Sequence, residues 1–107
     1  MKYASLGSIS SGTLLAADLL ETFADELEDH VQRNAEEWCS DAGRRARDAY
    51  MNLVHEAREI DPEEASELIG ELQDALGKFA PPYTYFGTHE GDGADFGYWP
   101  SWARGTR

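Results

Sequence analysis

The residues with the most evident chemical potential lie close together, between His89 and Asp95. This stretch combines the imidazole of His89 with the carboxylates of Glu90, Asp92 and Asp95, and oxygen-rich sequences of this kind can bind a hard cation such as calcium. The spacing does not follow an EF-hand loop, which needs alternating acidic positions and a distant terminal glutamate. Glycine and aspartate also favour tight turns. We therefore interpret residues 87–95 as a glycine- and acid-rich turn and assign no metal or cofactor, with a cation site as the alternative.

Nucleophilic catalysis has little support in this sequence. Cys39 is the only cysteine, and as a nucleophile it would need a histidine base close by. At the end of a predicted helix beside Trp38, it is expected to be a small apolar filler. The three histidines are far apart, and His30 and Cys39 do not have a metal-ligand spacing. We expect no catalytic residue and no enzymatic activity.

The most regular chemical feature is a pair of carboxylate rows with the spacing of helix faces. The first row consists of Asp18, Glu21, Asp25, Glu28 and Asp29. The second row consists of Glu63, Glu64, Glu67, Glu71 and Asp74, with no Lys or Arg among them. We predict that these ten carboxylates form the partner-binding surface.

Three predicted helices carry these rows. The first begins between Thr13 and Asp18 and continues to Cys39. Ser40, Asp41 and Gly43 then provide a break followed by a new cap. Its predicted buried face contains Leu20, Phe23, Ala24, Leu27, Val31, Ala35 and Trp38. The second helix extends from about Ala42 to Glu59. Its predicted buried face contains Ala46, Ala49, Tyr50, Leu53, Val54, Ala57 and Ile60.

The third helix has the clearest start and is predicted over Asp61–Phe79. Asp61 is a capping residue, Pro62 suits the first helical position, and Glu64 completes a capping box. Its apolar face contains Leu68, Ile69, Leu72, Leu76 and Phe79.

Much of the positive charge lies on the second helix, at Arg44, Arg45, Arg47 and Arg58. We expect these arginines to pair with the acidic rows of the first and third helices. The alternative is a separate basic contact site.

Strands are predicted at both ends of the chain. A brief strand is predicted over Lys2–Ile9. At the other end, Pro81 and Pro82 stop the third helix, and a hairpin is predicted over residues 83–100. Together they predict an α+β domain, with three helices packed on a small three-stranded antiparallel sheet. The single domain spans residues 1–107, with a strand and turn over 1–12, helices over 14–79, the hairpin and a frayed tail over 101–107.

The hairpin is rich in aromatic residues. Alternation places Tyr83 and Tyr85 on one face of the sheet and Phe86 on the other, while Phe96 and Tyr98 share a face from which Trp99 points away. The helices need only one apolar face, so the other aromatic side chains either extend the core or form a binding surface.

Charge narrows the range of partners. The chain has 21 acidic and nine basic residues, for a formal net charge of −12. This charge argues against direct binding to nucleic acid or to an anionic membrane. It favours a basic protein partner. Residues 1–12 lack the apolar core of a signal peptide and no apolar run is long enough to span a membrane, so we expect a cytoplasmic protein.

Several segments resemble a family of small acidic proteins carried by phages, plasmids and integrated elements of bacteria. The similar segments are Gly12–Leu14, Asp18–Phe23, Pro81–Gly87 and Gly91–Trp99, the last with its glycine–aromatic pattern. The resemblance implies a mobile-element origin and transfers no functional residue. Small acidic proteins of such elements are often inhibitors of host defence, including anti-CRISPR proteins and DNA mimics.

The expected function is therefore that of a non-enzymatic inhibitor. Its acidic rows would occupy the basic nucleic-acid channel of a host defence complex, in particular a CRISPR effector, as a partial mimic of nucleic acid. The alternative is a structural or regulatory module that self-associates through the aromatic sheet face. The sequence leaves the partner's identity and the oligomeric state open.

Overall fold

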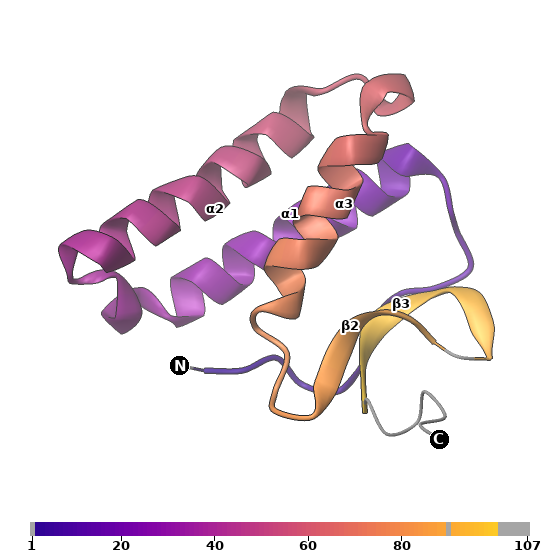
Figure 1. The fold of residues 1–107 in the computed structure, drawn as a ribbon. Coiled ribbons are helices and arrows are strands. Elements are labelled where there is room, and N and C mark those ends of the chain that lie inside the picture. The colour runs from indigo at the N-terminus through magenta and orange to yellow at the C-terminus, as the bar shows by residue number, and fades with distance from the viewer. Residues whose placement is uncertain (1, 90, 101–107) are drawn as a thin grey trace.

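The computed structural model describes residues 2–89 and 91–100. Three α-helices and a three-stranded antiparallel sheet form an α+β fold, which confirms the predicted class (Figure 1). The predicted tail over 101–107 lies outside the described residues. Within the described ranges, none of the helices has the length and apolar character that crossing a bilayer would require.

Helix α1 extends over Ala16–Arg33 and is shorter than predicted. Asn34 leaves the helical conformation and a 3-10 turn, η1, follows over Ala35–Trp38. The predicted burial of Ala35 is wrong, because this change of direction exposes it while Trp38 remains buried.

Helix α2 extends over Asp41–Glu59, close to its predicted range. The Ser40 side chain accepts a hydrogen bond from the Gly43 amide at 3.0 Å, which confirms the predicted cap. α2 packs against α1 and α3, in a layer beyond the helices that contact the sheet (Figure 1). Its buried face is narrower than predicted, since Val54 and Ala57 are buried but Ala49 is exposed.

The predicted third helix is divided in two. A 3-10 turn, η2, covers Pro62–Glu64, and α3 extends over Ser66–Gly77. The Asp61 side chain accepts from the Glu63 amide at 3.0 Å, so this residue caps the turn rather than a continuous helix. The break lets Ala65 become fully buried between the two segments.

The sheet has the order β1-β3-β2, with β1 over Gly7–Ser10, β2 over Thr84–His89 and β3 over Asp92–Pro100. β1 is shorter than the strand predicted over Lys2–Ile9. The hairpin is confirmed, but the long turn predicted over residues 87–95 is wrong. Most of that stretch continues the two strands, and His89 is paired with Asp92.

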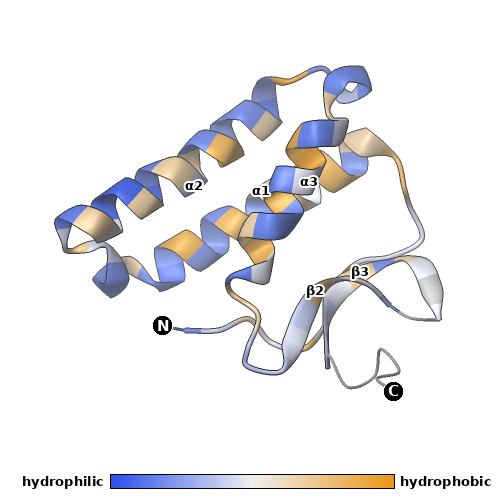
Figure 2. Cartoon of the chain, viewed as in Figure 1, coloured by the Kyte–Doolittle hydropathy of each residue, from blue (hydrophilic) through white to orange (hydrophobic). Residues whose placement is uncertain are grey.

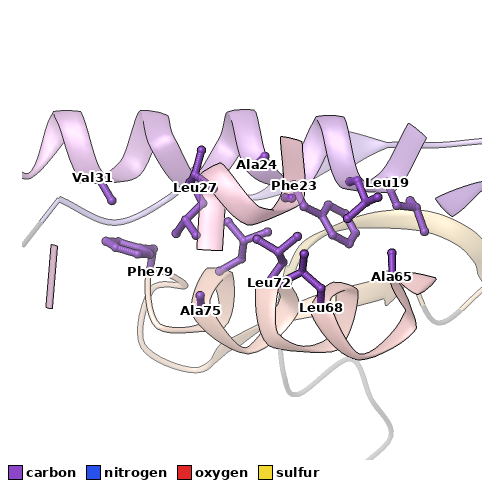
Figure 3. Close-up of a cluster of buried hydrophobic side chains, with 14 of the residues drawn as sticks. Leu19, Phe23, Ala24, Leu27, Val31, Ala65, Leu68, Leu72, Ala75 and Phe79 are labelled. Carbon is purple, nitrogen blue, oxygen red and sulfur yellow. The ribbon is translucent and has the colours of Figure 1, made fainter. Parts of the chain in front are cut away.

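The core lies between α1, α3 and the inner face of the sheet. Apolar side chains from α1 and from the segment containing α3 point toward one another in Figure 3. Figure 2 shows the apolar stretches of α1 and α3 alternating with hydrophilic ones. The ring of Phe23 contacts Phe86 and Phe96 in edge-on geometry, with centroids 5.4 and 5.2 Å apart. These contacts attach the hairpin to α1.

Candidate functional site

The second carboxylate row remains open to solvent. All five of its members, Glu63, Glu64, Glu67, Glu71 and Asp74, are exposed. Three members, Glu67, Glu71 and Asp74, lie on α3 at steps of four and three residues, so they share a helix face. Within residues 2–89 and 91–100, no ion pair reaches this row.

The first row is partly neutralised within the molecule. Arg58 Nη2 lies 3.1 Å from Asp25 Oδ1 and 2.7 Å from Glu28 Oε1, which links α2 to α1. Arg33 binds Asp29 at 3.0 Å. The hydrogen bond from Arg58 lowers the pKa of Glu28, and the carboxylates of Glu28 and then Asp25 raise the pKa of Arg58.

The other arginines follow a different pattern from the one predicted. Arg44 pairs with Asp41 and Arg47 pairs with Asp48, both within α2. Pairing with the acidic rows is therefore confirmed for Arg58 and wrong for Arg44 and Arg47. In the described part of the chain, Arg45 makes no ion pair.

The two rows lie on different elements, the first on α1 and the second on η2 and α3. The apolar faces of α1 and α3 meet in the core (Figure 3), so the acidic face of each helix is directed away from their shared contact. The α1 row borders α2 through Arg58. Within the described residues, the row on η2 and α3, which we call the α3 acidic face, has no ion-paired member.

A buried polar network joins the first helix to the sheet. His30 and Tyr98 are both fully buried, and Nε2 of His30 lies 2.7 Å from the Tyr98 hydroxyl. That hydroxyl donates to Glu26 Oε2 at 3.2 Å, and His30 Nε2 lies 2.8 Å from the same oxygen. Arg33 Nη2 lies 2.9 Å from His30 Nδ1. A guanidinium can only donate, so Nδ1 accepts and Nε2 carries the proton.

The network favours the charged form of the Glu26 carboxylate beside the neutral phenol of Tyr98. Hydrogen bonding with His30 lowers the pKa of Glu26, although partial burial opposes the shift. Burial and then the nearby Glu26 charge raise the pKa of Tyr98. Because His30 is shielded by the stacked Phe79 ring at 4.8 Å, it cannot contact a substrate from its buried position. The arrangement holds β3 against α1.

Sequence reasoning missed this network, although a local signal was present. His30 continues the apolar face of α1 at three residues from Leu27, and Glu26 lies four residues before it. Asn34 lies four residues after His30 and is also buried. Its Nδ2 donates to the carbonyl oxygens of His30 at 2.9 Å and Lys2 at 3.1 Å, so it ties the N-terminal segment to α1.

The stretch from His89 to Asp95 does not form a ligand cluster in the described residues. His89 Nδ1 accepts from the Gly91 amide at 3.0 Å, and its ring meets Trp99 edge-on at 4.7 Å. The Ser8 hydroxyl donates to Asp95. In this part of the chain, no group of three or more His, Cys, Asp or Glu side chains could hold a metal ion. Glu90 and the side chain of Asp92 lie outside what the structure describes, so this finding concerns His89 and Asp95.

Cys39 is exposed, so the prediction that it fills apolar space is wrong. It lies between η1 and α2, where the chain turns back along α1.

No protein-family model, curated protein or solved structure matches this chain.

Proposed function

We propose that the protein is a non-enzymatic inhibitor that binds a basic, nucleic-acid-binding complex through the α3 acidic face. The observation that carries the proposal is that every carboxylate of this face is exposed and none is ion-paired within the described residues. Such a face presents its full charge to a partner lined with Lys and Arg.

The spacing supports partial mimicry of nucleic acid. Glu67, Glu71 and Asp74 succeed one another at about 5 Å along the axis of α3. Duplex DNA carries one charge per roughly 1.7 Å of its axis. The face is therefore sparser than a duplex, and binding requires additional contacts from neighbouring residues.

The partner class follows from the charge and from the resemblance to proteins of phages and mobile elements. A nucleic-acid channel of a bacterial defence complex, in particular a CRISPR effector, is positively charged and accessible in the bacterial cytoplasm. An acidic protein that enters this channel would compete with target DNA without any chemical step.

A plaque assay tests the proposal. The protein is expressed in bacteria with and without CRISPR defence, and plaque formation by a targeted phage is counted. We expect the protein to increase plaque formation only in the defended strain. The double variant Glu67→Lys/Glu71→Lys should lose this effect, because the reversed charges repel the basic channel.

A matched pair of variants distinguishes the two acidic rows. Glu67→Gln/Glu71→Gln and Asp25→Asn/Glu28→Gln change the net charge equally. The first should weaken inhibition more, since Asp25 and Glu28 already bind Arg58. Equal effects would contradict a specific role for the α3 acidic face.

Self-association is the second candidate function, and the outer sheet face favours it. Tyr85 and Trp99 are paired across the strands on the face opposite Phe86 and Tyr98. Tyr83 is 86% exposed beside them in sequence. A homo-oligomer that resists salt and survives Glu67→Lys/Glu71→Lys would support this function over inhibition.

A further inference from the structure

A pocket with a volume of about 520 Å³ opens between the C-terminal end of α1, η1 and the first half of α2. Val31, Trp38 and Met51 supply its apolar wall, and Arg44 and Arg47 line it from α2. The volume lies in the range of sites that enclose a small organic molecule. This region is separate from the α3 acidic face.

The apolar wall is held in place by contacts with the rest of the fold. Trp38 is 8% exposed, and its indole Nε1 donates to the Val31 carbonyl at 2.8 Å. The Trp38 ring also contacts Tyr50 with centroids 6.0 Å apart. A Cβ added at Gly43 would lie 2.4 Å from the Glu37 carbonyl oxygen, so α2 starts in direct contact with η1. The pocket is therefore preformed, which reduces the ordering cost of binding.

The charge of the pocket is opposite to that of the protein. The chain has a net charge of −12, yet among the described residues no Asp or Glu lines this pocket. Arg44 and Arg47 are 51% and 43% exposed. Their pairings with Asp41 and Asp48 are exposed ion pairs, which contribute little to stability, so little free energy opposes their replacement by a ligand carboxylate.

The arginines are also held near the pocket. Arg44 Nη1 donates to the Cys39 carbonyl at 3.0 Å, which fixes its side chain along the turn between η1 and α2. A guanidinium has five donors in a planar fork that matches a carboxylate. Donors remain for a ligand after these contacts are made.

We propose that this pocket binds a small organic anion, with an acyl or aryl body against Trp38 and Met51 and a carboxylate bound by Arg44 and Arg47. Inorganic anions lack the apolar body that the wall would cover. Anionic membrane surfaces are repelled by the overall charge of the chain.

Decanoate and decanol are suitable probes, because they share an acyl chain and differ in the carboxylate. Decanoate is titrated into the isotope-labelled protein below its micelle concentration and decanol below its solubility limit, and amide and indole NMR signals are followed. We expect saturable binding of decanoate, with changes at Trp38 and along the first half of α2, and about tenfold weaker binding of decanol.

Two variants and a control locate the site. Arg44→Gln/Arg47→Gln should remove the preference for decanoate over decanol. Arg45→Gln should retain that preference, because Arg45 is exposed on α2 but does not line the pocket. Ala35→Phe should weaken both probes by filling the pocket from an exposed position of η1.

Three results would overturn the proposal. The first is equal affinity of the unaltered protein for decanoate and decanol. The second is an equal loss of the preference for decanoate in Arg44→Gln/Arg47→Gln and in Arg45→Gln. The third is unchanged binding of both probes by Ala35→Phe. Far-ultraviolet circular dichroism of each variant verifies that the fold is retained.

Discussion

The hydroxyl of Tyr98 on β3 lies 2.7 Å from Nε2 of His30 on α1, and both residues are fully buried. These residues are 68 positions apart in the chain. The contact therefore requires the helices and the sheet to be assembled together.

Replacing Tyr98 with Phe should lower the free energy of unfolding by about 1–3 kcal/mol, because the Glu26 carboxylate loses a donor and buried His30 loses one of the two partners of its Nε2. Urea denaturation measures the loss. Tyr85→Phe is the control, since its hydroxyl donates to the exposed Thr88 carbonyl. The free energy of unfolding of Tyr85→Phe should fall by less than about 1 kcal/mol. Equal losses in Tyr98→Phe and Tyr85→Phe would contradict a structural role for the network.

Glu26 should contribute to acid unfolding. Its pKa is lowered in the folded protein, chiefly by hydrogen bonding with His30. A lowered folded pKa gives stability that is present above the ordinary value of 4.5 and is lost as pH falls through the folded pKa. The stability difference between the unaltered protein and Glu26→Gln should therefore shrink from about pH 7 to about pH 3.

Chemical denaturation across this pH range measures the effect of Glu26. Glu56→Gln, at an exposed position of α2, controls for the loss of one carboxylate. A stability difference that follows the same course with pH in Glu26→Gln and Glu56→Gln would show that the Glu26 carboxylate does not couple folding to pH.

Replacing Gly97 or Gly70 with alanine should change the stability of the protein in opposite directions. A Cβ at Gly97 of β3 would lie 2.2 Å from the Gly7 carbonyl oxygen of β1. Gly97→Ala should therefore destabilise by about 1–3 kcal/mol or more. At Gly70, exposed on α3, nothing lies within 4 Å of the added carbon, and Gly70→Ala should stabilise by about 0.5–1 kcal/mol. Thermal unfolding distinguishes these outcomes, and stabilisation by Gly97→Ala would mean that β1 does not approach β3 as described.

Removing Arg58 should change the titration of its carboxylate partner. The hydrogen bond from Arg58 lowers the pKa of Glu28, so Arg58→Gln should move this pKa upward. Carboxyl NMR titration measures the change, and Arg45→Gln controls for the loss of one positive charge. An equal shift in both variants would indicate a general charge effect instead of the specific pair.

Local periodicity was sufficient to predict the main elements of this fold. Leu20, Phe23 and Leu27 identify the buried face of α1 because their spacing follows the helix repeat. The hairpin was predicted because Phe86 and Tyr98 lie in β-prone runs separated by glycine. In contrast, the η2 turn was not predicted, since a 3-10 turn and the first turn of an α-helix use the same capping residues at Asp61 and Pro62.

Contacts between distant segments could not be derived from spacing. Ala35 and Ala49 occupy apolar positions of a helical repeat, but each is exposed, because burial depends on where neighbouring helices end. The pairing of His30 with Tyr98 likewise depends on the placement of β3. For the carboxylates, helical spacing predicts two similar rows, and the ion pairs that Arg58 and Arg33 make with the first row distinguish them.

The strand order has a consequence for synthesis on the ribosome. β3 is the central strand, and β1 pairs with it alone. The residues of β1 therefore leave the ribosome long before their partner at Asp92–Pro100 has been made. At about 5–20 residues per second, this delay lasts several seconds, during which the helices can form while the nascent β1 segment stays unpaired.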